Sequence, residues 1–169
     1  MNTSEKFQNK MNLTVEQHHR EIASKLVSLI RELERKLGKE KAHEIVSEWA
    51  ECNSVNDIKG VMKSLEKAVN DFEDVKLLMR QWVKDLNENN METVEITTET
   101  ETDSICIVTD CIYAKVFGDL NASDIGYILY CKHDFAAAPV IHPRVGLRRS
   151  KTLMEGHDCC DFDYYWMPE

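Results

Sequence analysis

The chain has 169 residues, 43% of them hydrophobic, which is typical of a globular protein with its own core. Its formal net charge of −9, without a basic stripe, argues against binding to nucleic acid or to an anionic membrane surface. No apolar run approaches the roughly 20 residues that span a bilayer, and the N-terminus lacks the apolar segment of a signal peptide, so we expect a cytoplasmic protein.

The first half of the chain predicts helices. Apolar residues recur at three- and four-residue spacing from Thr14 to Leu37, with a capping pattern at Thr14 and Gln17 and a stop at Gly38. This helix is long enough to be compatible with a homodimer. Further helices are predicted over Lys39–Glu51, from a cap at Asn53 or Ser54 to Val69, and from Asp71 to Leu86.

The second half predicts strands, because apolar and polar residues begin to alternate around Val94 and Ile96. We expect an α+β fold in a single domain over 1–169. A helical layer of three to four helices (1–90) precedes an antiparallel sheet of about four strands, which a helical pair interrupts (91–169). The expected elements are strands at Ser104–Thr109, Val145–Leu153 and Cys159–Trp166, helices at Cys111–Phe117 and Ser123–Phe135, a loop at Pro139 and Pro143, and a hairpin turn at Glu155–Gly156.

Five of the six cysteines lie between positions 106 and 160. Side chains alternate along the last strand, so Cys160 shares its apolar face with Phe162 and Tyr164, whereas Cys159 points outward. Cys106 fits a small core residue, and each other cysteine taken singly also fits the core. In a reduced compartment these thiols are candidates for ligands or nucleophiles rather than for disulfides.

The segment YCKHDF places Cys131 and Asp134 three residues apart, and so on one face of the predicted helix. His133 would point away from that pair. Cys131 and Asp134, together with Cys160, Cys111 and His157, form a candidate site. It lies in the second half of the chain, which also carries most of the negative charge.

We expect no cofactor. No two cysteines have the C-x₂-C spacing of a structural zinc site, and adjacent Cys159 and Cys160 point in opposite directions along a strand. A mixed zinc site of Cys111, Cys131, His157 and Cys160 remains the alternative.

The segment from about Cys111 to Trp166 resembles the L-2-amino-thiazoline-4-carboxylic acid hydrolase family. An early helical cysteine, a C-x-x-D element, a basic strand with Thr-Leu and a G-x-x-x-C-D-F ending carry the resemblance. The matching residues are Cys111; Cys131 and Asp134; Arg149, Thr152 and Leu153; and Gly156, Cys160, Asp161 and Phe162. The resemblance implies a bacterial hydrolase that opens a thiazoline ring to N-carbamoyl-L-cysteine.

Opening this ring requires water to add to the carbon between nitrogen and sulfur, followed by cleavage of the C–S bond. Cys131 or Cys160 could act as the nucleophile, or Asp134 could activate water directly. We expect Arg149 to hold the substrate carboxylate, because two parallel hydrogen bonds join a guanidinium to a carboxylate. The other predicted substrate-binding residues are Cys111, His157 and Asp161.

Two other functions remain open. The chain is also similar to 4-vinyl-reductase-like (4VR) domains, which implies a non-catalytic sensor that binds a ligand or a metal. The helical half could instead serve mainly for dimerisation. In both the hydrolase and the sensor, the expected partner is a small molecule.

Overall fold

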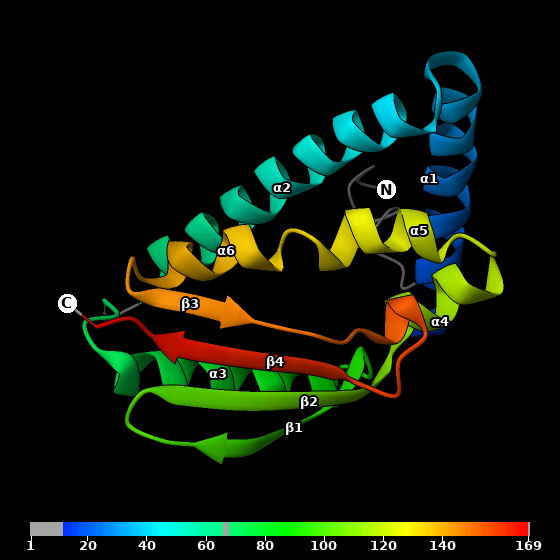
Figure 1. The fold of residues 1–169 in the computed structure, drawn as a ribbon. Coiled ribbons are helices and arrows are strands. Elements are labelled where there is room, and N and C mark those ends of the chain that lie inside the picture. Colours follow the sequence, from blue (N-terminus) through cyan, green and yellow to red (C-terminus); the bar gives the residue numbers. More distant parts are fainter. Residues whose placement is uncertain (1–11, 66–67, 169) are drawn as a thin grey trace, which may run out of the picture.

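The computed structural model describes residues 12–65 and 68–168 and shows an α+β fold (Figure 1). Long helices come first, and a run of short helices then separates the second strand from the third, which confirms the predicted fold class. The elements are α1 (Val15–Leu37), α2 (Lys39–Ser64), α3 (Phe72–Glu88), β1 (Glu92–Glu99), β2 (Asp103–Cys111), α4 (Ile112–Asp119), α5 (Ser123–Gly126), a π-helical turn (Tyr127–Cys131), α6 (Asp134–Ile141), β3 (Val145–Arg148), a 3₁₀ turn (Leu153–Glu155) and β4 (Cys160–Trp166).

Helix α1 begins and ends where the sequence predicts. The Thr14 hydroxyl accepts a hydrogen bond from the Gln17 amide, and the Gln17 side chain accepts one from the Thr14 amide, which completes a capping box. Gly38, at φ 82°, ends α1 and directly precedes α2, so a single residue joins the two longest helices. Its positive φ explains why glycine occupies this position.

The prediction of two separate helices between Lys39 and Val69 is wrong, because α2 runs without interruption to Ser64. Asn53 and Ser54 lie inside this helix and cap nothing. Asparagine and serine are moderate helix formers rather than helix breakers, so packing of α2 along α6 outweighs their preference for a cap. Figure 1 shows α2 reaching from the end of α1 across to α6.

The four strands form one antiparallel sheet in the order β1-β2-β4-β3. Helix α3 packs on β1 and α6 packs on β3. The predicted alternation along β4 is confirmed, because Cys160, Phe162 and Tyr164 pack in the hydrophobic clusters beneath these helices.

Strand β3 is shorter than predicted and does not reach β4 through a simple hairpin. It ends at Arg148, and two and three residues further on the amides of Ser150 and Lys151 donate to the carboxylate of Asp161 at 2.9 and 2.6 Å instead of extending the sheet. A 3₁₀ turn follows, and Gly156 ends it at φ 87°. This irregular stretch carries Arg149 inward, off the regular path of the strand.

The predicted helix over Ser123–Phe135 is also different in the structure. After α5, the backbone forms a π-helical turn, in which the Lys132 amide donates to the Tyr127 carbonyl oxygen at 2.9 Å. Helix α6 then starts at Asp134 and includes Pro139, where a loop was expected. Among the described residues, no helix combines the length and apolar character needed to cross a membrane.

Candidate functional site

A cavity of about 450 Å³ lies between the inner face of the sheet and helices α2, α3 and α6. Its lining includes the thiols of Cys111, Cys131 and Cys160 and the charged side chains of Asp134 and Arg149. Residues that are up to 49 positions apart in the sequence therefore converge on one space. A comparable hollow of about 510 Å³ beside the start of α1 has no thiol among its described lining residues. The 450 Å³ cavity, called the central cavity below, is therefore the better candidate site.

Two of the predicted substrate-binding residues lie outside the lining of the central cavity. His157 is exposed in the turn before β4. Asp161 points to the other side of β4, where its carboxylate accepts the Ser150 and Lys151 amides and the Ser150 hydroxyl. Asp161 therefore shapes the segment that carries Arg149, and we assign neither Asp161 nor His157 a contact with substrate.

The π-helical turn determines which side chains of the YCKHDF segment face the central cavity. A π turn contains more residues than an α-helical turn, so it rotates the residues that follow it. Cys131, His133 and Asp134 all line the cavity, and the expectation that His133 points away is wrong. The His133 Nε2 atom lies 2.6 Å from the Leu129 carbonyl oxygen, whereas its buried Nδ1 has no hydrogen-bond partner among the described residues. Because Nε2 must donate to a carbonyl oxygen, Nδ1 is an acceptor in the neutral ring.

Arg149 is bound by two groups of its own chain. Its side chain is only 2% exposed, its Nη1 lies 2.5 Å from Asp134 Oδ2, and its Nη2 donates to the Cys131 carbonyl oxygen at 2.8 Å. The guanidinium also lies over the rings of Phe135 and Phe162. This arrangement differs from the expected one, in which Arg149 receives a substrate carboxylate. Instead, Arg149 holds the Asp134 carboxylate in place at the start of α6.

Burial raises the pKa of Asp134, and the adjacent Arg149 cation opposes that rise. The carboxylate is therefore a stronger base than an exposed aspartate, while the Arg149 cation favours its ionised form.

Glu92, at the start of β1, is a second, half-buried acid in the lining of the central cavity and is absent from the predicted site. Burial raises its pKa to about 7, while a hydrogen bond from the Cys111 thiol at 3.6 Å opposes the rise. The signal was present in the sequence, because Glu92 shares a strand face with the apolar Val94 and Ile96. The glutamates around it are exposed, and this is why the segment looked like an ordinary strand with one wet face.

The three cavity thiols are protonated at neutral pH. Burial raises the pKa of Cys111 to about 12, and it also raises the pKa values of Cys131 and Cys160. The Cys160 sulfur accepts a hydrogen bond from the Leu153 amide at 3.2 Å. Because the thiolate rather than the thiol attacks carbon, these cysteines are weak nucleophiles in this setting.

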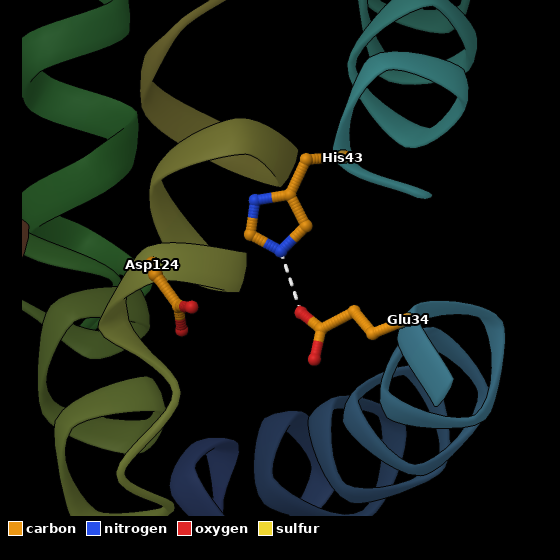
Figure 2. A group of neighbouring side chains, drawn as sticks. All are labelled: Glu34, His43 and Asp124. Atoms are coloured by element: carbon orange, nitrogen blue, oxygen red, sulfur yellow. Dashed lines mark hydrogen bonds and ion pairs between the residues drawn. The ribbon is translucent and has the colours of Figure 1, made fainter. Parts of the chain in front are cut away.

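A separate group of metal-binding side chains lies where α1, α2 and α5 meet. Figure 2 shows Glu34, His43 and Asp124 pointing toward one another, and their ligand atoms lie within 4.8 Å. The Glu34 and Asp124 carboxylates are nevertheless paired with cations: Arg31 binds both at 2.9 Å, and Lys39 binds Asp124 at 2.6 Å. Burial disfavours the charge on Asp124, but Lys39 and Arg31 outweigh it and lower its pKa to about 2. We interpret the group as an ion-pair network that ties the three helices together.

Comparison with known proteins relates residues 16–164 to the model of the L-2-amino-thiazoline-4-carboxylic acid hydrolase family. No curated protein sequence matches the chain. Among solved structures, the fold is similar to the phenol-responsive sensory domain of the transcription activator PoxR, crystallised with phenol. The TM-score is 0.54 at 14% identity, and the match covers 94% of this chain and 77% of the other.

Proposed function

Because the chain belongs to the L-2-amino-thiazoline-4-carboxylic acid hydrolase family, we propose that it hydrolyses a small molecule with a cyclic amidine-like ring. One observation carries the proposal: two half-buried carboxylates in different surroundings, Asp134 and Glu92, line one cavity together. When two acids of one site have different surroundings, their pKa values differ, so one can act as the base and the other as the acid. The central cavity, at about 450 Å³, is also of the size that holds small molecules.

We assign the base to Asp134. The Arg149 contact fixes its orientation and favours its ionised form, so it can take a proton from a water molecule that attacks the ring carbon between nitrogen and sulfur. A protonated amidine ring carries positive charge next to that carbon, and the negative charge of Asp134 attracts it. Binding and activation would then use the same carboxylate.

We assign the acid to Glu92. With a pKa of about 7, a large fraction of Glu92 is protonated near neutral pH. When the carbon–sulfur bond of the hydrated ring breaks, the proton of Glu92 passes to the leaving sulfur. The hydroxyl left on carbon then gives its proton to the Glu92 carboxylate, which forms the carbonyl group and restores the acid, and Asp134 releases the proton it took from water to solvent. For 2-amino-thiazoline-4-carboxylate, these steps produce N-carbamoyl-cysteine.

This assignment leaves the three thiols as polarisable lining rather than as nucleophiles, because burial keeps them protonated. It also replaces the expected role of Arg149 as the substrate clamp with a positioning role toward Asp134. All steps use side chains of the chain itself, so we propose hydrolysis without a cofactor.

The test is incubation of the purified protein with 2-amino-thiazoline-4-carboxylate and with unsubstituted 2-amino-2-thiazoline, with and without divalent metal. Released thiol and the ureido product are followed by mass spectrometry. We expect turnover of at least one ring without added metal, and its loss in Asp134→Asn but not in Asp158→Asn, which changes an exposed aspartate. If the wild type opens neither ring under any condition, the proposed activity is wrong.

A non-catalytic ligand-binding sensor is the second candidate. The aromatic lining of the central cavity favours it: Trp82, Tyr113, Tyr130, Phe162 and Tyr164 all contribute. The structural likeness to a phenol-responsive sensory domain is in line with this candidate. Saturable binding of an aromatic ligand by wild-type protein that opens no ring would favour the sensor over the hydrolase.

A further inference from the structure

A second, smaller cavity adjoins the central cavity beneath α3. Its volume is about 80 Å³, well above the roughly 10–15 Å³ that one water molecule needs, so it admits a short alkyl chain or one ring. We call it the side chamber. It shares six lining residues with the central cavity: Trp82, Leu86, Glu92, Val108, Phe162 and Tyr164.

The side chamber is apolar beyond the shared wall. Its remaining lining residues are Met79, Val83, Val94 and Cys106. Burial raises the pKa of the Cys106 thiol to about 11, so this residue is uncharged at neutral pH. A ligand group that enters the side chamber gains by leaving water only if it is itself apolar.

The charges of the central cavity do not favour a substrate carboxylate. Among its described lining residues, Arg149 is the one arginine or lysine, and it is already bound to Asp134 and to the Cys131 carbonyl oxygen. A carboxylate that entered here would be repelled by Asp134, and also by Glu92 whenever Glu92 is ionised. An incoming cation would instead be attracted by Asp134 and by the ionised fraction of Glu92.

From these observations we infer that the preferred substrate is a cationic amidine or isothiourea whose ring carries an alkyl or aryl group where the thiazoline acid carries its carboxylate. The amidine end lies between Asp134 and Glu92, and the apolar group occupies the side chamber. The choice of a cyclic isothiourea core rests on the proposed function, whereas the preference for an apolar over an anionic substituent rests on the two cavities.

Calorimetric titration of the wild-type protein with three ligands tests this inference: 2-amino-2-thiazoline, its 4-carboxylate and its 4-isobutyl derivative. Because each buried methylene group strengthens binding about fourfold, we expect the isobutyl compound to bind on the order of 10- to 100-fold more tightly than the parent. The carboxylate should bind more weakly than the parent. If the carboxylate binds as tightly as the isobutyl compound, or if none of the three binds, the inference is wrong.

Thiol release measured in parallel separates this inference from the proposed function. If the ligands bind in the expected order but no thiol is released, the proposed hydrolase activity is wrong and the inferred ligand class is supported. If the protein turns over the carboxylate in preference to the other ligands, the proposed activity is supported and the inferred ligand class is wrong.

A substitution that fills the side chamber provides a second test. Val94→Phe should weaken binding of the isobutyl compound at least tenfold and change binding of the parent by less than about threefold. Val83→Phe fills the same space from α3 and replaces Val94→Phe if that variant does not fold. Thr93→Phe is the matched control, because Thr93 is exposed and its side chain points to the opposite face of β1. Equal losses for both ligands in the filled variant would contradict the inference.

Discussion

Arg149 Nη1 lies 2.5 Å from Asp134 Oδ2, and this contact joins the end of β3 to the start of α6 inside the central cavity. The Arg149 side chain is 2% exposed and the Asp134 side chain 26% exposed, so the pair is largely but not fully buried. An ion pair of this kind contributes little net stability, but removing one partner leaves the other charge uncompensated. The contact therefore has consequences for stability as well as for activity.

Arg149→Met should destabilise the protein by at most about 3–5 kcal/mol at pH 7, because it leaves the largely buried Asp134 charge without its partner. The deficit should shrink at lower pH, where Asp134 takes up a proton. Urea unfolding at pH 5 and pH 7 measures both effects. The neighbouring Arg148→Met is the control, because Arg148 is 58% exposed and should matter far less. Equal losses in the two variants would contradict the structural role of Arg149.

Glu92 should make the protein less stable as the pH rises. Its folded pKa, about 7, lies above the ordinary value of 4.5, so the folded state binds more protons than the unfolded state between these values. Stability therefore falls as the pH rises through this window, by up to about 3 kcal/mol. Glu92→Gln should remove this decline and be the more stable protein at pH 8.

Chemical denaturation of the wild type and Glu92→Gln at intervals from pH 5 to pH 8 checks this prediction. The isosteric amide retains an oxygen that can accept from the Cys111 thiol, so the comparison isolates the charge. Parallel curves for the two proteins would show that Glu92 titrates normally, and they would also remove its assignment as the acid.

Single Cys→Ser substitutions should leave turnover within about tenfold of the wild type, because burial keeps the thiols of Cys111, Cys131 and Cys160 protonated. Asp134→Asn should lose about 10²–10⁴-fold, the usual contribution of a general base. Steady-state assays of the four variants, with intact-mass spectra of quenched reactions, measure this. A covalent adduct that disappears in one Cys→Ser variant together with activity would identify that cysteine as a nucleophile.

The stability of the protein should depend on the Glu34–His43–Asp124 group but should not change when metal is added. His43→Ala should lower stability by about 1 kcal/mol, because the ring nitrogen lies 2.6 Å from Glu34 in a half-buried setting. Added zinc should leave the melting temperature unchanged, since Arg31 and Lys39 already neutralise both carboxylates. His18→Ala, at an exposed position, is the control. A zinc-dependent rise that His43→Ala abolishes would show that the group is a metal site.

Local signals predicted the parts of the fold that local physics determines. The Thr14–Gln17 capping box and Gly38 act through hydrogen bonds and dihedral angles within a few residues, and both lie where expected. Two-residue alternation alone predicts the inward face of β4, and Cys160 lies on that face, in a hydrophobic cluster. The α+β class followed from the change of periodicity near residue 90.

The features that the sequence did not reveal depend on contacts between distant segments. The length of β3 depends on Asp161, which lies 13 residues beyond its end and binds the amides that would have extended it. The orientation of His133 depends on a π-helical turn, and such a turn has no characteristic amino-acid pattern by which it could be predicted. The ion pair between Arg149 and Asp134 could not be predicted either, because the spacing of residues along the chain does not show which of them meet in space.

A crystal structure of the protein with bound 2-amino-2-thiazoline tests the central claim most directly. We predict the amidine group in the central cavity, with a nitrogen about 2.6–3.2 Å from the carboxylate of Asp134 and the ring facing Glu92. A ligand bound elsewhere, or Cys131, Asp134 and Cys160 wedged among apolar neighbours with no space between them, would contradict the account.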